Sequence, residues 1–267
     1  MASLSVVGTP IGNMGDISLR ALETLKNADL ILCEDTRVTR KLLDKYEIKT
    51  ATLSYHSHSK ISRIEEIIGR LKEGKNIALV SDAGTPGISD PGAELVGRVR
   101  QELKSEICSG ELKIVSVPGP SALIAALSIA GIRCDQSAGG FVFLGFLPHK
   151  KGRETLFREM AVSKRTTIFY ESPHRIIKTL ESLQKSNASF PEAACLKKAD
   201  SARSTSSTSL KKAVPEQRKI LDKRITVCRE LTKIFEEVTS GTAEEVKEFF
   251  EKNPDKIRGE FVVIVSK

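Results

Sequence analysis

Short apolar runs alternate with amphipathic stretches through the first half of the chain. Residues 17–27 and 61–74 place apolar side chains along one face at helical spacing. The runs between such stretches are rich in Val and Ile, which is typical of strands buried on both faces: "LSVVG" (4–8), "LILC" (30–33), "IALV" (77–80) and "KIVSV" (113–117). Strands that alternate with helices predict right-handed crossovers and a largely parallel sheet.

A break in this pattern divides the chain. Residues 118–132 predict a helix opened by proline and glycine, and "RCDQSAGG" then ends the periodicity, so we place a domain boundary near residue 137. Strand-like runs follow at 141–148, 166–175 and 259–267, with helical stretches at about 152–162, 174–184 and 242–252. The sequence thus predicts an N-terminal α/β domain over 1–137 and a C-terminal mixed α/β domain over 138–267.

One segment lacks this order. Residues 185–212 are rich in Ser, Ala and Lys with little periodicity, which is typical of a flexible insertion, and its basic character extends to about residue 224. Nine basic residues stand against three acidic ones over 197–224. A solvated loop is favoured over an RNA contact, because charge runs commonly serve solubility.

Charge and cysteine usage narrow the class of protein. The chain has 42 Lys and Arg against 34 Asp and Glu, a net charge of +8, which favours a polyanionic partner without choosing one; a basic surface that binds nothing has equal weight. The five cysteines are widely spaced with no CxxC pair, as in an intracellular protein with reduced thiols, and no metal site is expected. No signal peptide or membrane span is indicated, so we expect a cytoplasmic protein without membrane contact.

Three glycine-rich stretches each follow a predicted strand: "GTPIGN" (8–13), "SDAGTPGISDPG" (81–92) and "PGPSA" (118–122). They are expected to converge at the carboxyl edge of the sheet, where open parallel sheets bind ligands. No stretch has the phosphate-binding pattern G-x-x-x-x-G-K-[ST], and no G-x-G-x-x-G opens a helix, which disfavours ATP and NAD. Prolines favour van der Waals and carbonyl contact with a flat or methyl-bearing ligand. Turns, however, need Gly and Pro in any case.

The order of motifs resembles that of the ribosomal RNA small subunit methyltransferase I family, among the tetrapyrrole-methylase-like S-adenosylmethionine enzymes. The resemblance runs from residue 4 to 265 and is interrupted only by the 185–224 region. It rests on eight stretches: "GTPIGNMGDISLRAL", "EDTRVTRKLL", "VSDAGTPGISDPG", "VPGPSALIAAL", "FLGFLP", "YESPHRI", "CRELTKIFEEV" and "RGEFVVIV".

This resemblance implies S-adenosylmethionine-dependent 2′-O-methylation of a cytidine ribose in small-subunit ribosomal RNA, free or assembled into the subunit. It also implies a homodimer, no metal, and a tetrapyrrole-methylase-like fold whose two α/β domains enclose the donor. The basic region before "ITVCRELTK" departs from the family pattern and leaves substrate access and the exact target open. Two alternatives stand beside this reading. The charge and the "EDTR" and "RELTK" motifs disfavour a precorrin-type tetrapyrrole methyltransferase, and the intact glycine loops disfavour a non-catalytic ribosome-assembly RNA-binding protein.

The resemblance also implies site residues. Lys233 is the first choice for the general base or for holding the acceptor ribose, with Arg229 and Glu230 beside it and Asp35 and Arg37 from "CEDTR". A structural ion-pair network is an equally weighted account of these charged motifs. The donor pocket would draw on Thr9, Pro10, Gly12, Asp82, Ala83, Gly84, Pro86, Ile88, Ser89, Ser121, Ala122, Tyr170, Glu171 and the chain near Gly259 and Glu260.

Two further residues have open roles. Asp90 either contacts the donor or caps the adjacent turn or helix. In "ESPHR", Arg175 either contacts a phosphate or belongs to a helix cap that follows Pro173.

Overall fold

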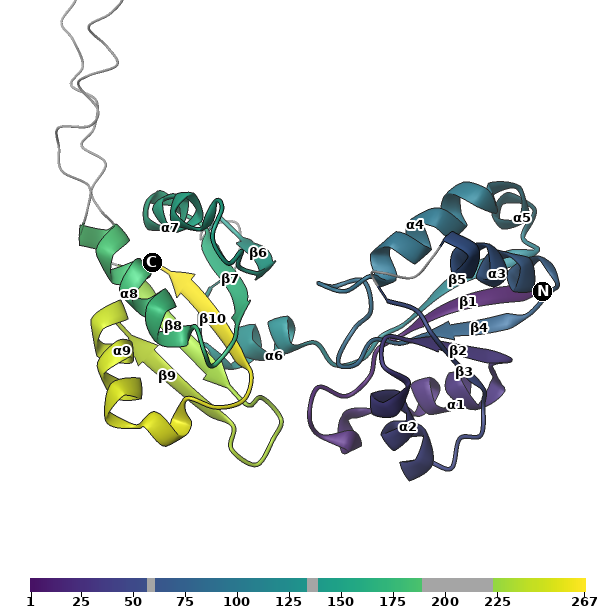
Figure 1. The fold of residues 1–267 in the computed structure, drawn as a ribbon, viewed down its shortest axis with the longest axis horizontal. Coiled ribbons are helices and arrows are strands. Elements are labelled where there is room, and N and C mark those ends of the chain that lie inside the picture. Colours follow the sequence, from purple (N-terminus) through teal and green to yellow (C-terminus); the bar gives the residue numbers. More distant parts are fainter. Residues whose placement is uncertain (57–60, 134–138, 189–222) are drawn as a thin grey trace, which may run out of the picture. The chain divides into compact units, whose positions relative to one another are not determined.

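The protein consists of two compact units, which a computed structural model describes over residues 1–56, 61–133, 139–188 and 223–267 (Figure 1). The first unit comprises Met1–Ile129 together with Glu230–Glu236, and the second comprises Ala130–Arg229 together with Glu237–Lys267. The boundary expected near residue 137 lies outside the described residues. So does all of the expected insertion except residues 185–188 and 223–224.

The first unit is built on a five-stranded parallel sheet with the order β3-β2-β4-β1-β5. Its strands are β1 (Ala2–Val7), β2 (Leu30–Cys33), β3 (Thr52–Ser54), β4 (Asn76–Leu79) and β5 (Leu112–Val117). Its helices are η1 (Met14–Asp16), α1 (Leu19–Asn27), α2 (Thr36–Lys45), α3 (Ile61–Lys72), α4 (Gly92–Glu102), α5 (Lys104–Ser109) and α6 (Ala122–Ile129). The parallel α/β class predicted for this half is confirmed.

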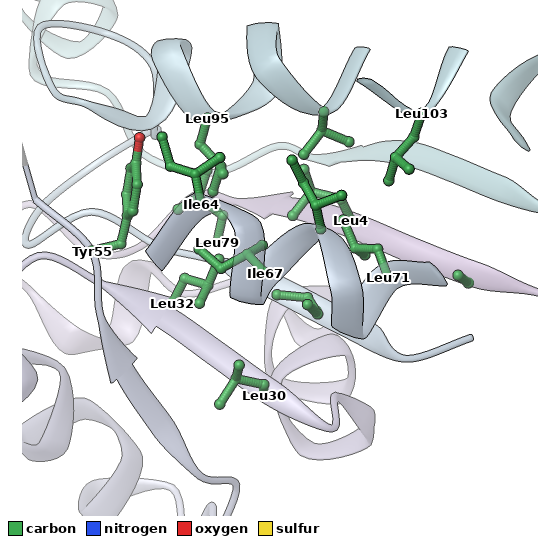
Figure 2. Close-up of a cluster of buried hydrophobic side chains, with 14 of the residues drawn as sticks. Leu4, Leu30, Leu32, Tyr55, Ile64, Ile67, Leu71, Leu79, Leu95 and Leu103 are labelled. Atoms are coloured by element: carbon green, nitrogen blue, oxygen red, sulfur yellow. The ribbon is translucent and has the colours of Figure 1, made fainter. Parts of the chain in front are cut away.

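Apolar side chains bury both faces of this sheet. In β2, Leu32 belongs to a cluster with side chains of α3 and α4, whereas its neighbour Ile31 belongs to a cluster with side chains of α1 and α2. Figure 2 shows the first cluster, in which Leu4 and Leu79 of the sheet pack with Ile67 of α3. Because successive strand residues point to opposite faces, a strand covered on both sides needs the unbroken apolar runs seen in the sequence.

The second unit holds a mixed sheet with the order β6-β7-β10-β8-β9, in which only β6 and β7 are parallel. Its strands are β6 (Phe141–Phe146), β7 (Thr166–Glu171), β8 (Arg224–Arg229), β9 (Glu237–Gly241) and β10 (Phe261–Ser266). Helices α7 (Arg153–Val162), α8 (Ile176–Ala188) and α9 (Ala243–Lys252) and the short η4 (Pro254–Lys256) complete it. Its core contains Phe157, Phe169, Phe250 and Phe261, all almost fully buried. The mixed sheet predicted for this half is therefore confirmed.

None of the helices in the described ranges is long and apolar enough to cross a membrane.

Candidate active site

Three glycine-rich loops meet at the carboxyl edge of the first sheet, as their positions after β1, β4 and β5 predicted. Thr9 and Gly84 form an isolated antiparallel bridge, with the Thr9 N–H donating to the Gly84 carbonyl at 2.9 Å and the Gly84 N–H donating back at 3.2 Å. The Thr85 hydroxyl donates to the Pro120 carbonyl at 3.0 Å. The middle loop is therefore hydrogen-bonded to both of the others.

The glycines of these loops are required by backbone packing. A Cβ added to Gly8 would lie 2.7 Å from Gly119 Cα, and one added to Gly119 would lie 2.7 Å from the Gly8 carbonyl oxygen. Gly84 has φ of +85°, a conformation that L side chains rarely adopt. These glycines let the loops lie backbone against backbone, which supplies a steric reason for them besides ligand contact.

The "SDAGTPGISDPG" loop owes its shape to Asp90. The Asp90 carboxylate accepts hydrogen bonds from the Gly87 N–H at 2.8 Å and from the Gly92 N–H, at the start of α4, at 2.7 Å. Ser89, between them, has φ of +71°. The capping role is therefore the one that the geometry gives to Asp90.

The donor candidates of the first unit differ in exposure. The side chains of the exposed candidates are accessible to a ligand. The buried candidates can contribute only by setting the backbone conformation of the loops. The exposed members are Gly12, Asp82, Ala83, Ile88 and Ser89; Pro10, Ser121 and Ala122 are half-buried, and Thr9, Gly84 and Pro86 are buried.

The "CEDTR" motif forms a local cap. Asp35 is the N-cap of α2 and accepts from the Arg37 N–H at 2.8 Å, while its carboxylate pairs with the Arg37 guanidinium at 2.6 Å. The hydrogen bond from Arg37 is the main reason that the pKa of Asp35 is lowered to about 2. Asp82 Oδ1 accepts from the Asp35 N–H at 3.0 Å, joining this motif to the middle loop. For Asp35 and Arg37, the structure shows the local ion pair and cap.

Glu34, one residue earlier, lies in a more acidic environment. Burial raises the pKa of its carboxyl group, and the nearby negative charges of Asp82 and Asp90 raise it further. A carboxyl group at this edge of the sheet thus holds its proton more readily than an ordinary glutamate.

The "RELTK" segment packs on the first glycine loop. Residues 230–236 belong to the first unit, and the Asn13 N–H donates to Thr232 Oγ1 at 3.1 Å. Lys233 lies directly against Gly12, since a Cβ added to Gly12 would lie 2.5 Å from Lys233 Cγ and 2.9 Å from its Cε. Lys233 Nζ is 2.8 Å from Glu230 Oε1. The structure thus brings together a residue predicted for the donor set and the residue predicted for catalysis.

The backbone of this segment is tightly constrained. Glu230 and Thr232 both have positive φ, at 51° and 65°, although neither is glycine. The Thr232 N–H donates to Glu236 Oε2 at 2.5 Å, and the Lys233 N–H donates to the Glu230 carbonyl at 3.0 Å. The sequence analysis did not single out Asn13 and Thr232. Only the hydrogen bond between them, which is far from local in sequence, shows that they join the first glycine loop to the "RELTK" segment.

The remaining candidates lie in the second unit. Arg229, at the end of β8, is buried and pairs with Glu237 at 3.4 Å, and Glu237 also accepts from Lys256 Nζ at 2.5 Å. Tyr170 makes edge-on ring contacts with Phe143 and Phe146. Glu260 is exposed and follows Gly259, which has φ of +83°.

Glu171 is fully engaged inside the second unit. One carboxylate oxygen lies 2.7 Å from Arg175 Nε and accepts from the Ser172 N–H at 2.9 Å. The other accepts from the Thr179 hydroxyl at 2.6 Å and from Arg153 at 3.1 Å. With its side chain buried, Glu171 can reach a donor only through its backbone. Arg175 likewise points inward, where its guanidinium pairs with Glu171 and donates to the Leu147 carbonyl, a structural role other than the predicted helix cap.

The sequence of this chain is similar to those of known proteins. The chain matches the family model of the Tetrapyrrole (Corrin/Porphyrin) Methylases over residues 3–247. A relative from Synechocystis is 40% identical over 100% of this chain and 79% of its own. One from Thermotoga maritima is 38% identical over 100% of this chain and 99% of its own, and one from Bacillus subtilis is 40% identical over 99% and 75%. All three are named ribosomal RNA small subunit methyltransferase I.

Solved structures share the fold. A cobalt precorrin-4 methyltransferase superposes with a TM-score of 0.57 at 17% identity, and the uroporphyrin-III-C-methyltransferase of Thermus thermophilus with 0.56 at 16%; each comparison covers 99% of this chain and 94% of the other. At such identities the likeness establishes architecture alone. The relatives at 38–40% identity, matched over 99–100% of this chain, and the family model show that the protein belongs to the ribosomal RNA small subunit methyltransferase I family of the tetrapyrrole methylases.

Proposed function

We propose that this protein transfers a methyl group from S-adenosylmethionine to the 2′-hydroxyl of a cytidine ribose in small-subunit ribosomal RNA. The names of its relatives support the substrate class. The observation that carries the chemistry is the packing of Lys233 against Gly12, because it sets a cationic side chain and its carboxylate partner on a loop at the ligand-binding edge of the sheet.

The residues at this edge fit a donor held by contacts with loop backbone and small side chains. S-adenosylmethionine, when bound, supplies an electrophilic methyl group on a sulfonium. The exposed members of the middle loop, Asp82, Ala83, Ile88 and Ser89, would hold it together with the backbone of the neighbouring loops. The hydrogen bonds between the loops fix their geometry in advance, and orientation of two reactants can account for much of the acceleration.

Lys233 and Glu230 would act as a pair on the acceptor. A carboxylate 2.8 Å away stabilises an ammonium, so Lys233 is suited to hold the 2′-oxygen by a charge-assisted hydrogen bond. The Glu230 carboxylate beside it can accept the hydroxyl proton as the new O–C bond forms and the S–C bond breaks. Of the two roles predicted for Lys233, we therefore propose that it holds the ribose and does not act as the general base.

The same segment offers an apolar surface for the acceptor base. The side chains of Ile234 and Phe235, next to Lys233, are 91% and 66% exposed. Single-stranded RNA bases commonly stack on exposed aromatic rings. The proposal therefore puts the acceptor nucleoside against residues 233–235.

We also propose that the protein acts as a homodimer on ribosomal RNA or the assembled small subunit. Exposed apolar side chains on α6 and the edge strand β5 support a second copy there: Ile124 is 55% exposed, Ile129 45% and Val115 37%.

The decisive experiment maps ribose methylation of small-subunit ribosomal RNA in cells with and without this protein. One cytidine should lose its 2′-O-methyl group when the protein is absent, and an unchanged map would remove the proposed function. Purified protein with labelled donor should label small ribosomal subunits and leave a precorrin-type substrate unlabelled. Labelling of the tetrapyrrole instead would indicate that the protein is a tetrapyrrole methyltransferase and does not act on ribosomal RNA.

A further inference from the structure

The excess positive charge of the chain lies in the second unit. Its residues include 25 Lys and Arg against 16 Asp and Glu, whereas the first unit has 17 against 18. The net charge of +8 therefore comes from the second unit, and the unit that holds the glycine-rich loops is nearly neutral. A polyanion should be attracted mainly to that unit.

One loop of the second unit presents two adjacent lysines, preceded by a histidine, to solvent. His149, Lys150 and Lys151 lie between β6 and α7 and are all exposed. Neither lysine forms an ion pair with any residue that the structure describes. Strands β6 and β7 are parallel neighbours (Figure 1), so His174, which is exposed and lies just after β7, is at the same end of the second sheet as residues 149–151.

A buried ionic frame fixes the start of this loop. The Arg175 guanidinium donates to the Leu147 carbonyl at 3.0 Å, and Arg153 donates to the Pro148 carbonyl at 3.2 Å. Both arginines are held by the buried carboxylate of Glu171. The two residues that precede His149 are thereby tied to the core of the unit.

The end of the loop is equally defined. Gly152, with φ of +82°, is the N-cap of α7, and Arg153 in the first turn of that helix reaches back into the frame. A buried ion cluster is a costly way to stabilise a fold, because desolvation offsets much of its Coulomb energy. Its effect here is positional, since it holds an exposed cationic loop in one place.

We propose that residues 149–151 form an RNA phosphate-binding loop, positioned by the Glu171–Arg153–Arg175 frame. Lysine ammonium groups bind phosphates as point charges, and such backbone contacts set the position of a nucleic acid rather than read its sequence. This inference rests on the proposed function for the identity of the polyanion. It adds a substrate-positioning surface on the second unit, separate from the residues assigned to chemistry.

The test compares two double variants of the full chain. Lys150→Ala/Lys151→Ala removes the proposed contacts. Lys164→Ala/Arg165→Ala removes two equally exposed charges that precede β7, at the opposite end of that strand. Binding of a small-subunit ribosomal RNA transcript is measured over a range of salt concentrations, and donor binding is measured by calorimetry.

The first variant should bind RNA more weakly. The magnitude of its negative slope of log K against log salt should decrease by about 1.4 to 1.8, because each of the two lost phosphate contacts contributes about 0.7–0.9 to the slope. Its donor affinity should equal that of the wild type. The control variant should keep the wild-type slope within about 0.5. Equal losses in both variants would overturn the inference, as would an unchanged slope in the first.

Adding a methylation assay and a binding assay with anionic phospholipid vesicles separates this inference from the proposed function. If the wild type methylates ribosomal RNA and the first variant binds it with wild-type affinity, only the phosphate-binding loop is lost. If the wild type binds no ribosomal RNA but binds anionic phospholipid vesicles, both proposals fail together.

Discussion

Lys233 is constrained along its whole length. Gly12 lies against its aliphatic stem, Glu230 binds its ammonium group, and its own N–H is hydrogen-bonded within the turn. A side chain held in this way has little conformational entropy left to lose when an acceptor arrives. Activity should therefore depend on the terminal group and also on the space that Gly12 leaves for the stem.

Lys233→Ala should lower turnover by about 100-fold or more, within the range for a group that acts in the chemical step, and should leave donor affinity within about twofold. Single-turnover kinetics with small ribosomal subunits and donor calorimetry provide the two measurements. Lys247→Ala is the matched control, because Lys247 also pairs with a glutamate, Glu251 at 2.8 Å on α9, and is not among the residues assigned to the site. A wild-type rate for Lys233→Ala would end the assignment of Lys233 to the active site.

Gly12→Ala should lower turnover because the new Cβ cannot coexist with Lys233 Cγ at 2.5 Å. If Gly12→Ala lowers turnover by displacing Lys233, adding it to Lys233→Ala should cause no further loss of turnover. The double-mutant cycle should then be strongly non-additive. Gly69→Ala on α3 is the control, since a Cβ there meets nothing within 4 Å and should stabilise by about 0.5–1 kcal/mol. Additive losses in the double variant would instead assign Gly12 a direct contact with ligand.

At the scale of elements, the sequence pattern located most of the buried strands but not β8, which is buried at five of its six residues. Strands β1, β2 and β4 match the prediction because both of their faces are covered, whereas the edge strand β5 matches it through its Ile and Val residues although Val115 is exposed. Strand β9, "EVTSG", escaped prediction because it is an edge strand with alternating exposure, and β3 is only three residues long. The convergence of the glycine loops could be predicted from the parallel topology of the strands that precede them. The packing of residues 230–236 on Gly12 could not, because it joins segments far apart in the sequence and no local pattern indicates it.

Glu171, which was predicted for the donor set, has a structural role within the second unit. Glu171→Gln should destabilise the second unit by about 3–5 kcal/mol, because it leaves two largely buried arginines, with side chains only 13% and 18% exposed, without their carboxylate. Glu154→Gln removes an exposed partner of Arg158 and should change stability by less than about 1 kcal/mol. Urea denaturation at neutral pH measures both. If Glu171→Gln unfolds like the wild type, the frame is not the stabilising feature that its burial indicates.

For the whole molecule, the division of charge and of apolar surface between the units suggests a division of tasks. The nearly neutral first unit carries the glycine-rich loops, Lys233 and the exposed apolar side chains of α6, while the basic second unit carries the proposed phosphate-binding loop. A neutral surface is the better one for self-association, because two copies of a strongly basic surface repel each other. The homodimer is therefore expected to form through the first unit.

Ile124→Glu should convert the dimer into a monomer, because it puts a charge into an apolar contact. Light scattering should give about twice 29.2 kDa for the wild type and 29.2 kDa for the variant at the same concentration. Leu19→Glu is the matched control, since Leu19 on α1 is 86% exposed and lies outside α6 and β5. A monomeric wild type would remove the homodimer, and a dimeric Ile124→Glu variant would move the interface away from α6. Methylation that persists in a true monomer would show that each chain is catalytically complete.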